Sequence, residues 1–379
     1  MQTRRSALQT IILAGVAGPS LLAGFPAVAE EVKSLKAAYK DDFVVGVAMN
    51  AAQIAGKDAL GDSIIRAQFN SISPENCLKW ENVHPEPGRY DFVVPDQYVA
   101  FGEKNGMFIL GHNLVWHSQV PDWVFHDDKG DLLTRDALLA RMQDHIRTVV
   151  GRYKGRIQSW DVVNEALNDD GSLRQSLWYK IIGDDYIAKA FQYAHDADPE
   201  AQLNYNDYSL VDESKRHGAV ALVTKLKEQG IPVATVGMQG HYNLDWPSAE
   251  LVDATISDFA KLGVKVAVSE FDIDVLPPAT SQHTADVALN IKQNPTLNPY
   301  ANGLPDRVQK QLAKRYGDLF DVFVKHRDVV NRVTFWGLTD ADSWKNDWPV
   351  KGRTNYPLLF DRSGQPKLAY YAVIRAARK

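Results

Sequence analysis

The stretch WDVVNEAL (Trp160–Leu167) places an amide and a carboxylate, Asn164 and Glu165, directly after a run that is mostly apolar and β-branched. A short run of this kind is typical of a buried strand. The two polar side chains would then lie where that strand ends. Most glutamates simply face water, so the meaning of Glu165 depends on what the rest of the chain places around it.

Short apolar runs of the same kind recur along the chain, and segments of helical periodicity lie between them. Eight such runs occur, at residues 44–49, 67–72, 107–111, 157–163, 202–205, 233–238, 264–269 and 333–338. Between two of them, Leu138, Met142 and Ile146 repeat at helical spacing. Eight strand-and-helix units in one domain predict an α/β fold of the (β/α)8 TIM barrel type, for which about 250 residues are typical and insertions are common.

The first 29 residues differ from the rest of the chain. Arg4 and Arg5 precede an apolar stretch that glycine and proline interrupt, and the stretch ends in AVA before acidic residues. This pattern is typical of an export signal, and the arginine pair favours the twin-arginine route over the general secretory route. We therefore expect residues 1–29 to direct export to the periplasm or the medium. Residues 30–379 contain no linker and are expected to form one barrel domain.

Composition narrows the classes of partner. The formal net charge of −5 gives no reason to expect a nucleic acid or an anionic membrane. Cys77 is the one cysteine, so no intramolecular disulfide can form and stability must come from a large core. His112 and His117 lack the spacing of a zinc site. We expect a monomer that uses neither a metal nor another cofactor.

Polar side chains gather where the predicted strands end, which is where TIM barrels carry their catalytic groups. These residues are His112 and Asn113, Asn164 and Glu165, Asn204 to Asp207, Gln239 and His241, Glu270 and Asp272, and Thr339 and Asp340. Glu165 and Glu270 fall on the fourth and seventh predicted strands, which face each other across the barrel mouth. Paired carboxyl groups across a cleft are what glycoside hydrolysis requires, since one donates a proton while the other attacks or activates water.

Tryptophan supplies a second indication of a sugar-binding cleft. Trp160 and Trp178 lie in an apolar run and a helix-like segment, where core packing is the simpler explanation. Six of the nine tryptophans instead lie in or just beyond strand-end segments: Trp80, Trp116, Trp123, Trp336, Trp344 and Trp348. Flat indole faces at such positions can stack on sugar rings.

Longer motifs make the interpretation more specific. They are WDVVNEAL, GHNLVWHSQVPDW, ENCLKWENV, VGMQGHY, VAVSEFDID and FWGLTDADSW. From about Phe43 to the C-terminus the chain resembles glycoside hydrolase family 10, whose best-known members are retaining endo-1,4-β-xylanases. The resemblance implies that Glu165 is the acid/base, that Glu270 is the nucleophile, and that xylan and xylo-oligosaccharides are the substrates.

The same resemblance implies a set of substrate-binding residues. The glycone side would be lined by Glu75, Asn76, Lys79, His112, Trp116, Gln119, Asn164, Gln239, His241, Trp336 and Trp344. Tyr208 resembles a residue that stacks on the aglycone side. Gln119 and Trp344 resemble the residues that leave no room for the hydroxymethyl group by which glucose differs from xylose.

The nucleophile can also be argued from spacing. Glu270 and Asp272 are two residues apart on a predicted strand, so their side chains point to the same face. His241 follows the preceding strand. We predict that His241 bridges the two carboxylates and keeps Glu270 ionised; the alternative is a histidine that caps a loop carbonyl. Asn164 is predicted to bond the 2-hydroxyl of the sugar under attack.

Three functions remain open from the sequence. The first is an endo-xylanase, and the second is a barrel glycosidase that acts on cellulose or mixed β-glucan. The third is a non-catalytic glycan-binding barrel, although both glutamates are present and neither is substituted. The loop at residues 275–305 is longer than the minimal connection.

Overall fold

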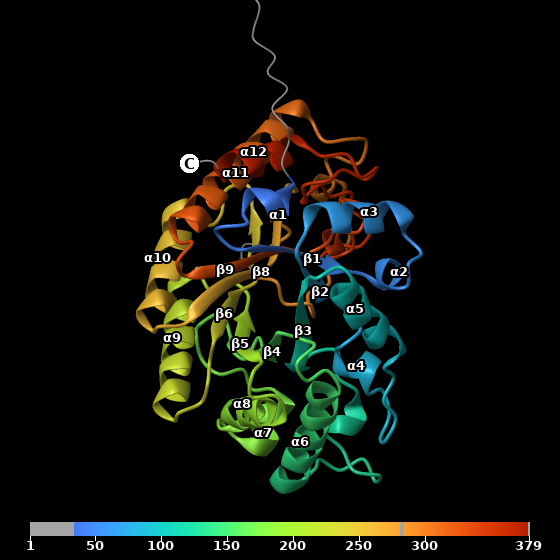
Figure 1. Cartoon of the computed structure of the whole chain (residues 1–379), viewed down its shortest axis with the longest axis vertical. Coiled ribbons are helices and arrows are strands. Elements are labelled where there is room, and N and C mark those ends of the chain that lie inside the picture. The colour runs from blue at the N-terminus through green and yellow to red at the C-terminus, as the bar shows by residue number, and fades with distance from the viewer. Residues whose placement is uncertain (1–33, 281–283, 378–379) are drawn as a thin grey trace, which may run out of the picture. The chain divides into compact units, whose positions relative to one another are not determined.

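The computed structural model describes residues 34–280 and 284–377, and the expected export signal at residues 1–29 lies outside them (Figure 1). Parallel strands form one sheet in the order β6-β5-β4-β3-β2-β1-β9-β8-β7, and β6 also pairs with β8. This extra pairing closes eight strands into a barrel, which confirms the predicted fold. The eight strands are β1 (Val44–Met49), β2 (Ser71–Pro74), β3 (Phe108–Val115), β4 (Ser159–Asn164), β5 (Gln202–Asp207), β6 (Thr235–Met238), β8 (Lys265–Asp274) and β9 (Val330–Phe335).

The remaining strand, β7 (His241–Asn243), lies just beyond β6 and pairs with the end of β8, with His241 opposite Asp272. It therefore extends the sheet past the barrel at the end where β8 carries its glutamate. Several predicted boundaries differ from those of the structure. The run at 67–72 is predicted to be strand from its start, but α3 (Ala59–Gln68) ends inside it and the strand begins at Ser71. The run at 333–338 begins and ends three residues later than its strand, Val330–Phe335.

Helices surround the strands (Figure 1). They are α1 (Leu35–Ala38), α2 (Ala51–Ile54), α3 (Ala59–Gln68), α4 (Trp80–Val83), α5 (Val93–Lys104), α6 (Arg135–Arg152), α7 (Leu177–Ile182), α8 (Tyr186–Ala197), α9 (Glu213–Glu228), α10 (Ala249–Lys261), α11 (Asp306–Lys325) and α12 (Leu368–Ala376). In α6 the predicted stripe of Leu138, Met142 and Ile146 is fully buried. The hydroxyl of Thr134 begins this helix by accepting a hydrogen bond from the backbone N–H of Ala137. Over the described ranges, no helix combines the length and apolar character that a membrane crossing needs.

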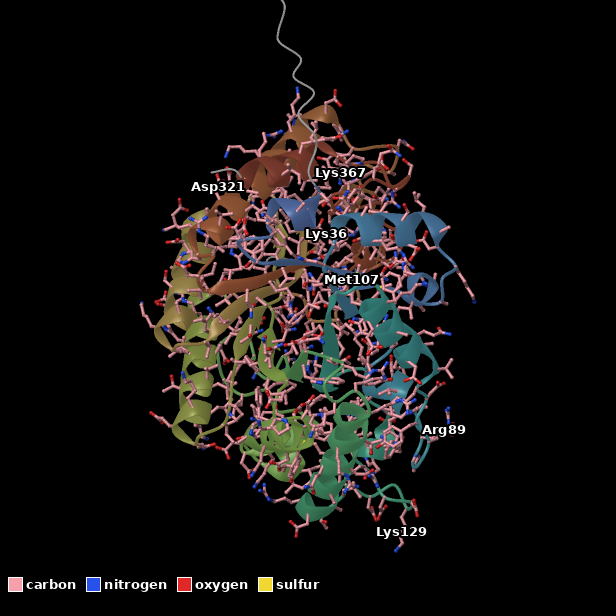
Figure 2. All side chains as sticks on the ribbon, viewed as in Figure 1. Lys36, Arg89, Met107, Lys129, Asp321 and Lys367 are labelled. Carbon is pink, nitrogen blue, oxygen red and sulfur yellow. The ribbon has the colours of Figure 1, made fainter. Side chains whose placement is uncertain are left out.

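Side chains fill the space between the strands and the helices (Figure 2). The fit is close between β3 and β4, where Gly111 pairs in register with Trp160. The Trp160 side chain is completely buried, and a Cβ added at Gly111 would lie 2.1 Å from its Cε3 atom. Because Gly111 on β3 has no side chain, the Trp160 indole can occupy this space. Trp160 lies on β4, the strand that also carries Asn164.

We expect Gly111→Ala to lower the free energy of unfolding by about 1–3 kcal/mol, because the added methyl overpacks the core against Trp160. Denaturant unfolding followed by circular dichroism measures the change. Gly151→Ala in α6 is the matched control, since its added Cβ meets no atom within 4 Å and alanine is favoured in a helix. Equal stability of the two variants would mean that β3 and β4 shift freely to admit the methyl.

Candidate active site

Side chains at the carboxyl ends of the strands enclose a pocket of about 160 Å³. Glu165 and Glu270 both line it, together with Ala285 and Val287 from the long loop after β8. The other lining residues are Glu75, Asn76, Lys79, His112, Trp116, Gln119, Asn164, Gln239, His241, Trp336 and Trp344. The structure thus brings together both candidate catalytic residues and all the residues expected on the glycone side.

Some aromatic residues expected in the cleft do not line this pocket: Tyr208, Trp80, Trp123 and Trp348. Tyr208 is only 2% exposed, and the ammonium of Lys215 covers its ring at 3.2 Å from the centroid. Its hydroxyl accepts a hydrogen bond from Arg174, so the ring as placed has no free face towards the pocket. Trp80 is also buried in the core and packs against His145, with ring centroids 3.5 Å apart. The aglycone role of Tyr208 stays a prediction.

Glu165 is the first residue after β4 and lies in the left-handed region of the backbone map, with φ of 56°. Non-glycine residues rarely adopt this conformation, which costs on the order of 1 kcal/mol and persists only where neighbours hold it. The backbone N–H donates to the carbonyl of Asn206 at 2.8 Å. The side chain accepts hydrogen bonds from Trp116 Nε1 at 2.8 Å and from Gln239 Nε2 at 2.9 Å.

The electrostatic surroundings of Glu165 favour its protonated form. Burial raises the pKa of its carboxyl to about 7, and the negative charges of Asp207 and Glu270 act in the same direction. The hydrogen bonds from Gln239 and Trp116 oppose this rise because they stabilise the carboxylate. Glu165 therefore holds a proton up to about neutral pH and can release it, which are the properties of a general acid.

Glu270 lies next to a histidine that contacts two carboxylates. His241 Nε2 is 3.3 Å from Glu270 Oε2, and His241 Nδ1 is 3.0 Å from Asp272 Oδ2. Burial lowers the pKa of His241, but Asp272 and the two hydrogen bonds outweigh it and raise the pKa overall. Burial raises the pKa of Asp272, yet His241 and Lys345 lower it overall. The contacts have the geometry predicted from the sequence, and the raised pKa favours the charged form of His241 beside Glu270.

Asn206 on β5 links the two glutamates, and sequence reasoning gave it no role. Its Nδ2 donates to Glu270 Oε1 and to Asn164 Oδ1, both at 2.8 Å. Asn164 in turn donates to Glu165 Oε1 at 3.3 Å. Asn206 was noted only as part of the polar group at 204–207. Asn206 lies opposite Asn164 in the register of β4 and β5, and this pairing explains its contacts with both glutamates' surroundings. The register cannot be read from the sequence and is known only from the structure.

The glycone-side residues hold one another in place. Lys79 Nζ donates to Asn76 Oδ1 at 2.9 Å and to Gln119 Oε1 at 2.6 Å, and it lies 5.0 Å from the centroid of the Trp116 ring. Burial lowers the pKa of Lys79, against the attraction of the nearby glutamates. His112 Nδ1 contacts Asp161 at 2.9 Å. These polar atoms line the pocket in fixed positions, as sugar hydroxyls require.

After β9, Trp344 Nε1 donates to Asp272 Oδ2 at 2.8 Å, and the Trp344 ring stacks on Trp348 with centroids 4.5 Å apart. The indole is therefore fixed by the same carboxylate that holds His241. Within residues 34–280 and 284–377, no group of three or more His, Cys, Asp or Glu side chains is arranged to hold a metal ion. Metal-independent catalysis stays a prediction.

We expect the Glu165 carboxyl to titrate near pH 7 instead of near its ordinary value of 4.5. Carbon NMR of protein labelled at glutamate measures this, with Glu165→Gln assigning the signal. Gln239→Leu should move the titration to higher pH, because it removes a hydrogen bond that favours the charged form. A signal that titrates near 4.5, or that Gln239→Leu leaves unmoved, would contradict this account of the environment.

Comparison with known proteins agrees with this geometry. The family model described as Glycosyl hydrolase family 10 matches residues 34–376. Endo-1,4-beta-xylanase A of Xylanibacter ruminicola is 44% identical over 94% of this chain and 96% of its own length. Beta-1,4-xylanase of Dictyoglomus thermophilum is 43% identical over 91% of each chain. A solved GH10 endoxylanase from a sugarcane soil metagenome superposes with a TM-score of 0.88 at 48% identity, over 90% of this chain and 99% of its own. The chain therefore belongs to glycosyl hydrolase family 10.

Proposed function

We propose that the protein hydrolyses internal β-1,4-xylosidic bonds of xylan with retention of configuration, with Glu165 as acid/base and Glu270 as nucleophile. The observation that carries the proposal is the pair of buried carboxyl groups in one pocket. The surroundings of Glu165 favour its protonated form, and Glu270 lies beside His241, whose pKa is raised. The names of the xylanase relatives support the choice of substrate.

In the first step Glu165 donates its proton to the glycosidic oxygen while Glu270 attacks the anomeric carbon. The bond to the leaving group breaks, and a covalent glycosyl ester forms on Glu270. Asn164 is within reach of both carboxyl groups through its contacts with Glu165 and Asn206. It is therefore suited to bond the 2-hydroxyl, where the interaction strengthens as charge develops in the transition state.

In the second step Glu165 acts as a base. Once Glu270 is esterified, its negative charge is gone, and that charge is one of the causes that raise the pKa of Glu165. The pKa of Glu165 falls accordingly, so Glu165 stays ionised after the first step and is available to take a proton from the attacking water. The resulting hydroxide attacks the anomeric carbon and releases Glu270. Both residues return to their starting charge states.

Selection of xylose over glucose rests on Gln119 and Trp344. Both line the pocket, and the hydrogen bond to Asp272 together with the stack on Trp348 fixes the Trp344 ring. A hydroxymethyl group forced against a packed indole costs about 1–3 kcal/mol, which corresponds to a rate ratio of roughly ten to two hundred. This favours xylan over cellulose or mixed β-glucan, which the same two carboxyl groups could otherwise serve.

We expect Glu270→Ala to abolish turnover of every substrate. Glu165→Ala should lose activity on xylan but keep much of its rate on aryl xylobiosides whose phenol leaves without protonation. Steady-state kinetics on both substrates measure the difference. Glu103→Ala, which removes a surface glutamate paired with Arg156, is the control and should keep full activity. Equal losses on both substrates in both variants would contradict this division of roles.

We expect the sugar first released from xylo-oligosaccharides to carry the β configuration, because two successive displacements at one carbon give net retention. Proton NMR of the reaction before mutarotation distinguishes the anomers. Soluble cello-oligosaccharides of the same length serve as controls and should react at least about tenfold more slowly. A first-formed α anomer would overturn the covalent intermediate, and equal rates on the two sugar series would overturn the choice of xylan.

A further inference from the structure

The long loop after β8 brings a short segment over the pocket. We call residues 284–289 the strap. Ala285 and Val287 of the strap line the catalytic pocket. Thr284 and Leu289 of the strap line a separate hollow of about 70 Å³. His241 borders both spaces, so the strap forms a partition beside the nucleophile.

Two contacts at Asp286 anchor the strap. The Asp286 carboxylate lies 3.6 Å from Nη1 of Arg174. The Asp286 backbone carbonyl accepts a hydrogen bond from Trp348 Nε1 at 3.2 Å. Arg174 follows β4 in the chain, whereas Trp348 follows β9. The strap therefore joins the loop after β4 to the loop after β9.

Strands β4 and β9 are four positions apart around the closed barrel in either direction. On one side β3, β2 and β1 lie between them, and on the other side β5, β6 and β8 do. Asp286 contacts the loops after both strands, and its neighbours Ala285 and Val287 line the pocket, so the strap lies over the barrel mouth. On one side of the line between β4 and β9 lie Asn76, Lys79 and Gln119, and on the other side lie β5 and β6.

The anchor on the β4 side lies next to the acid/base. Arg174 Nε donates to the backbone carbonyl of Glu165 at 3.2 Å, and its Nη2 donates to the Tyr208 hydroxyl at 2.9 Å. The acid must face the oxygen of the leaving group. With the glycone held in the half that carries Lys79, the leaving group extends past Glu165 towards the half that carries Tyr208. The strap lies between these two halves.

We propose that the strap, held by the Asp286–Arg174 ion pair, restricts the leaving-group side of the cleft and makes Asp286 a specificity-determining residue. This inference rests on the proposed xylanase function. A short leaving group fits beside the strap, whereas a long xylan chain must displace it. The substrates turned over best are then short xylo-oligosaccharides, cut near their reducing ends, and polymeric xylan is turned over less efficiently per bond.

The test compares full-length wild type, Asp286→Ala and Asp185→Ala. The Asp185–Arg135 pair, at 2.6 Å, joins α6 to the start of α8 and does not line the pocket, so it controls for loss of a partly exposed Asp–Arg pair. The measured quantity is kcat/KM on soluble xylan divided by kcat/KM on an aryl xylobioside. The Asp286–Arg174 ion pair is partly exposed, and pairs of this kind are weak. We therefore expect this ratio to rise only about two- to fivefold in Asp286→Ala. It should not change in Asp185→Ala.

Xylohexaose labelled at its reducing end gives a second readout. Wild type should release mainly short labelled products, and Asp286→Ala should shift cleavage towards the middle of the chain. An unchanged ratio with an unchanged cleavage pattern would overturn the proposal. Equal losses on both substrates would also overturn it, since Asp286 would then only support the fold. A wild-type protein that cleaves neither substrate would instead refute the proposed function itself.

Discussion

The site depends on burying two carboxyl groups in one pocket with different surroundings. Two neighbouring carboxylates repel each other, and burial penalises each charge further. Glu165 resolves this conflict by staying protonated up to about neutral pH. Glu270 lies beside His241, and Asp272 and the hydrogen bonds of His241 raise the pKa of that histidine. The barrel makes both solutions possible because β4, β6 and β8 end at the same rim.

A buried ion pair near Glu165 contributes to its electrostatic surroundings. Asp207 is fully buried and forms an ion pair with buried Lys215 at 3.0 Å. Burying such groups without partners would cost several kcal/mol, so the pair must form together or not at all. The negative charge of Asp207 helps to raise the pKa of Glu165. The same lysine covers the Tyr208 ring, so one buried cation influences both the acid and the leaving-group side.

Sequence patterns predicted the barrel and its rim because both follow from local rules: apolar runs mark the strands, and polar residues mark their ends. The network through Asn206 could not be predicted, since it depends on the register between β4 and β5. The Tyr208 ring is covered by Lys215 from α9, and no motif in the sequence indicates this contact. Residues 284–289 show no periodicity, so only their contacts across the barrel mouth reveal their position.

Arg174 connects the chemistry of the site with the shape of its leaving-group side. One guanidinium contacts the Glu165 carbonyl, the Tyr208 hydroxyl and the Asp286 carboxylate. Glu165 holds an unfavourable backbone conformation that its neighbours must maintain. Any change in the strap that moves Arg174 is therefore transmitted to the backbone of the acid. Arg174 thus links the loop after β8 to the backbone of the residue that follows β4, through contacts made by one side chain.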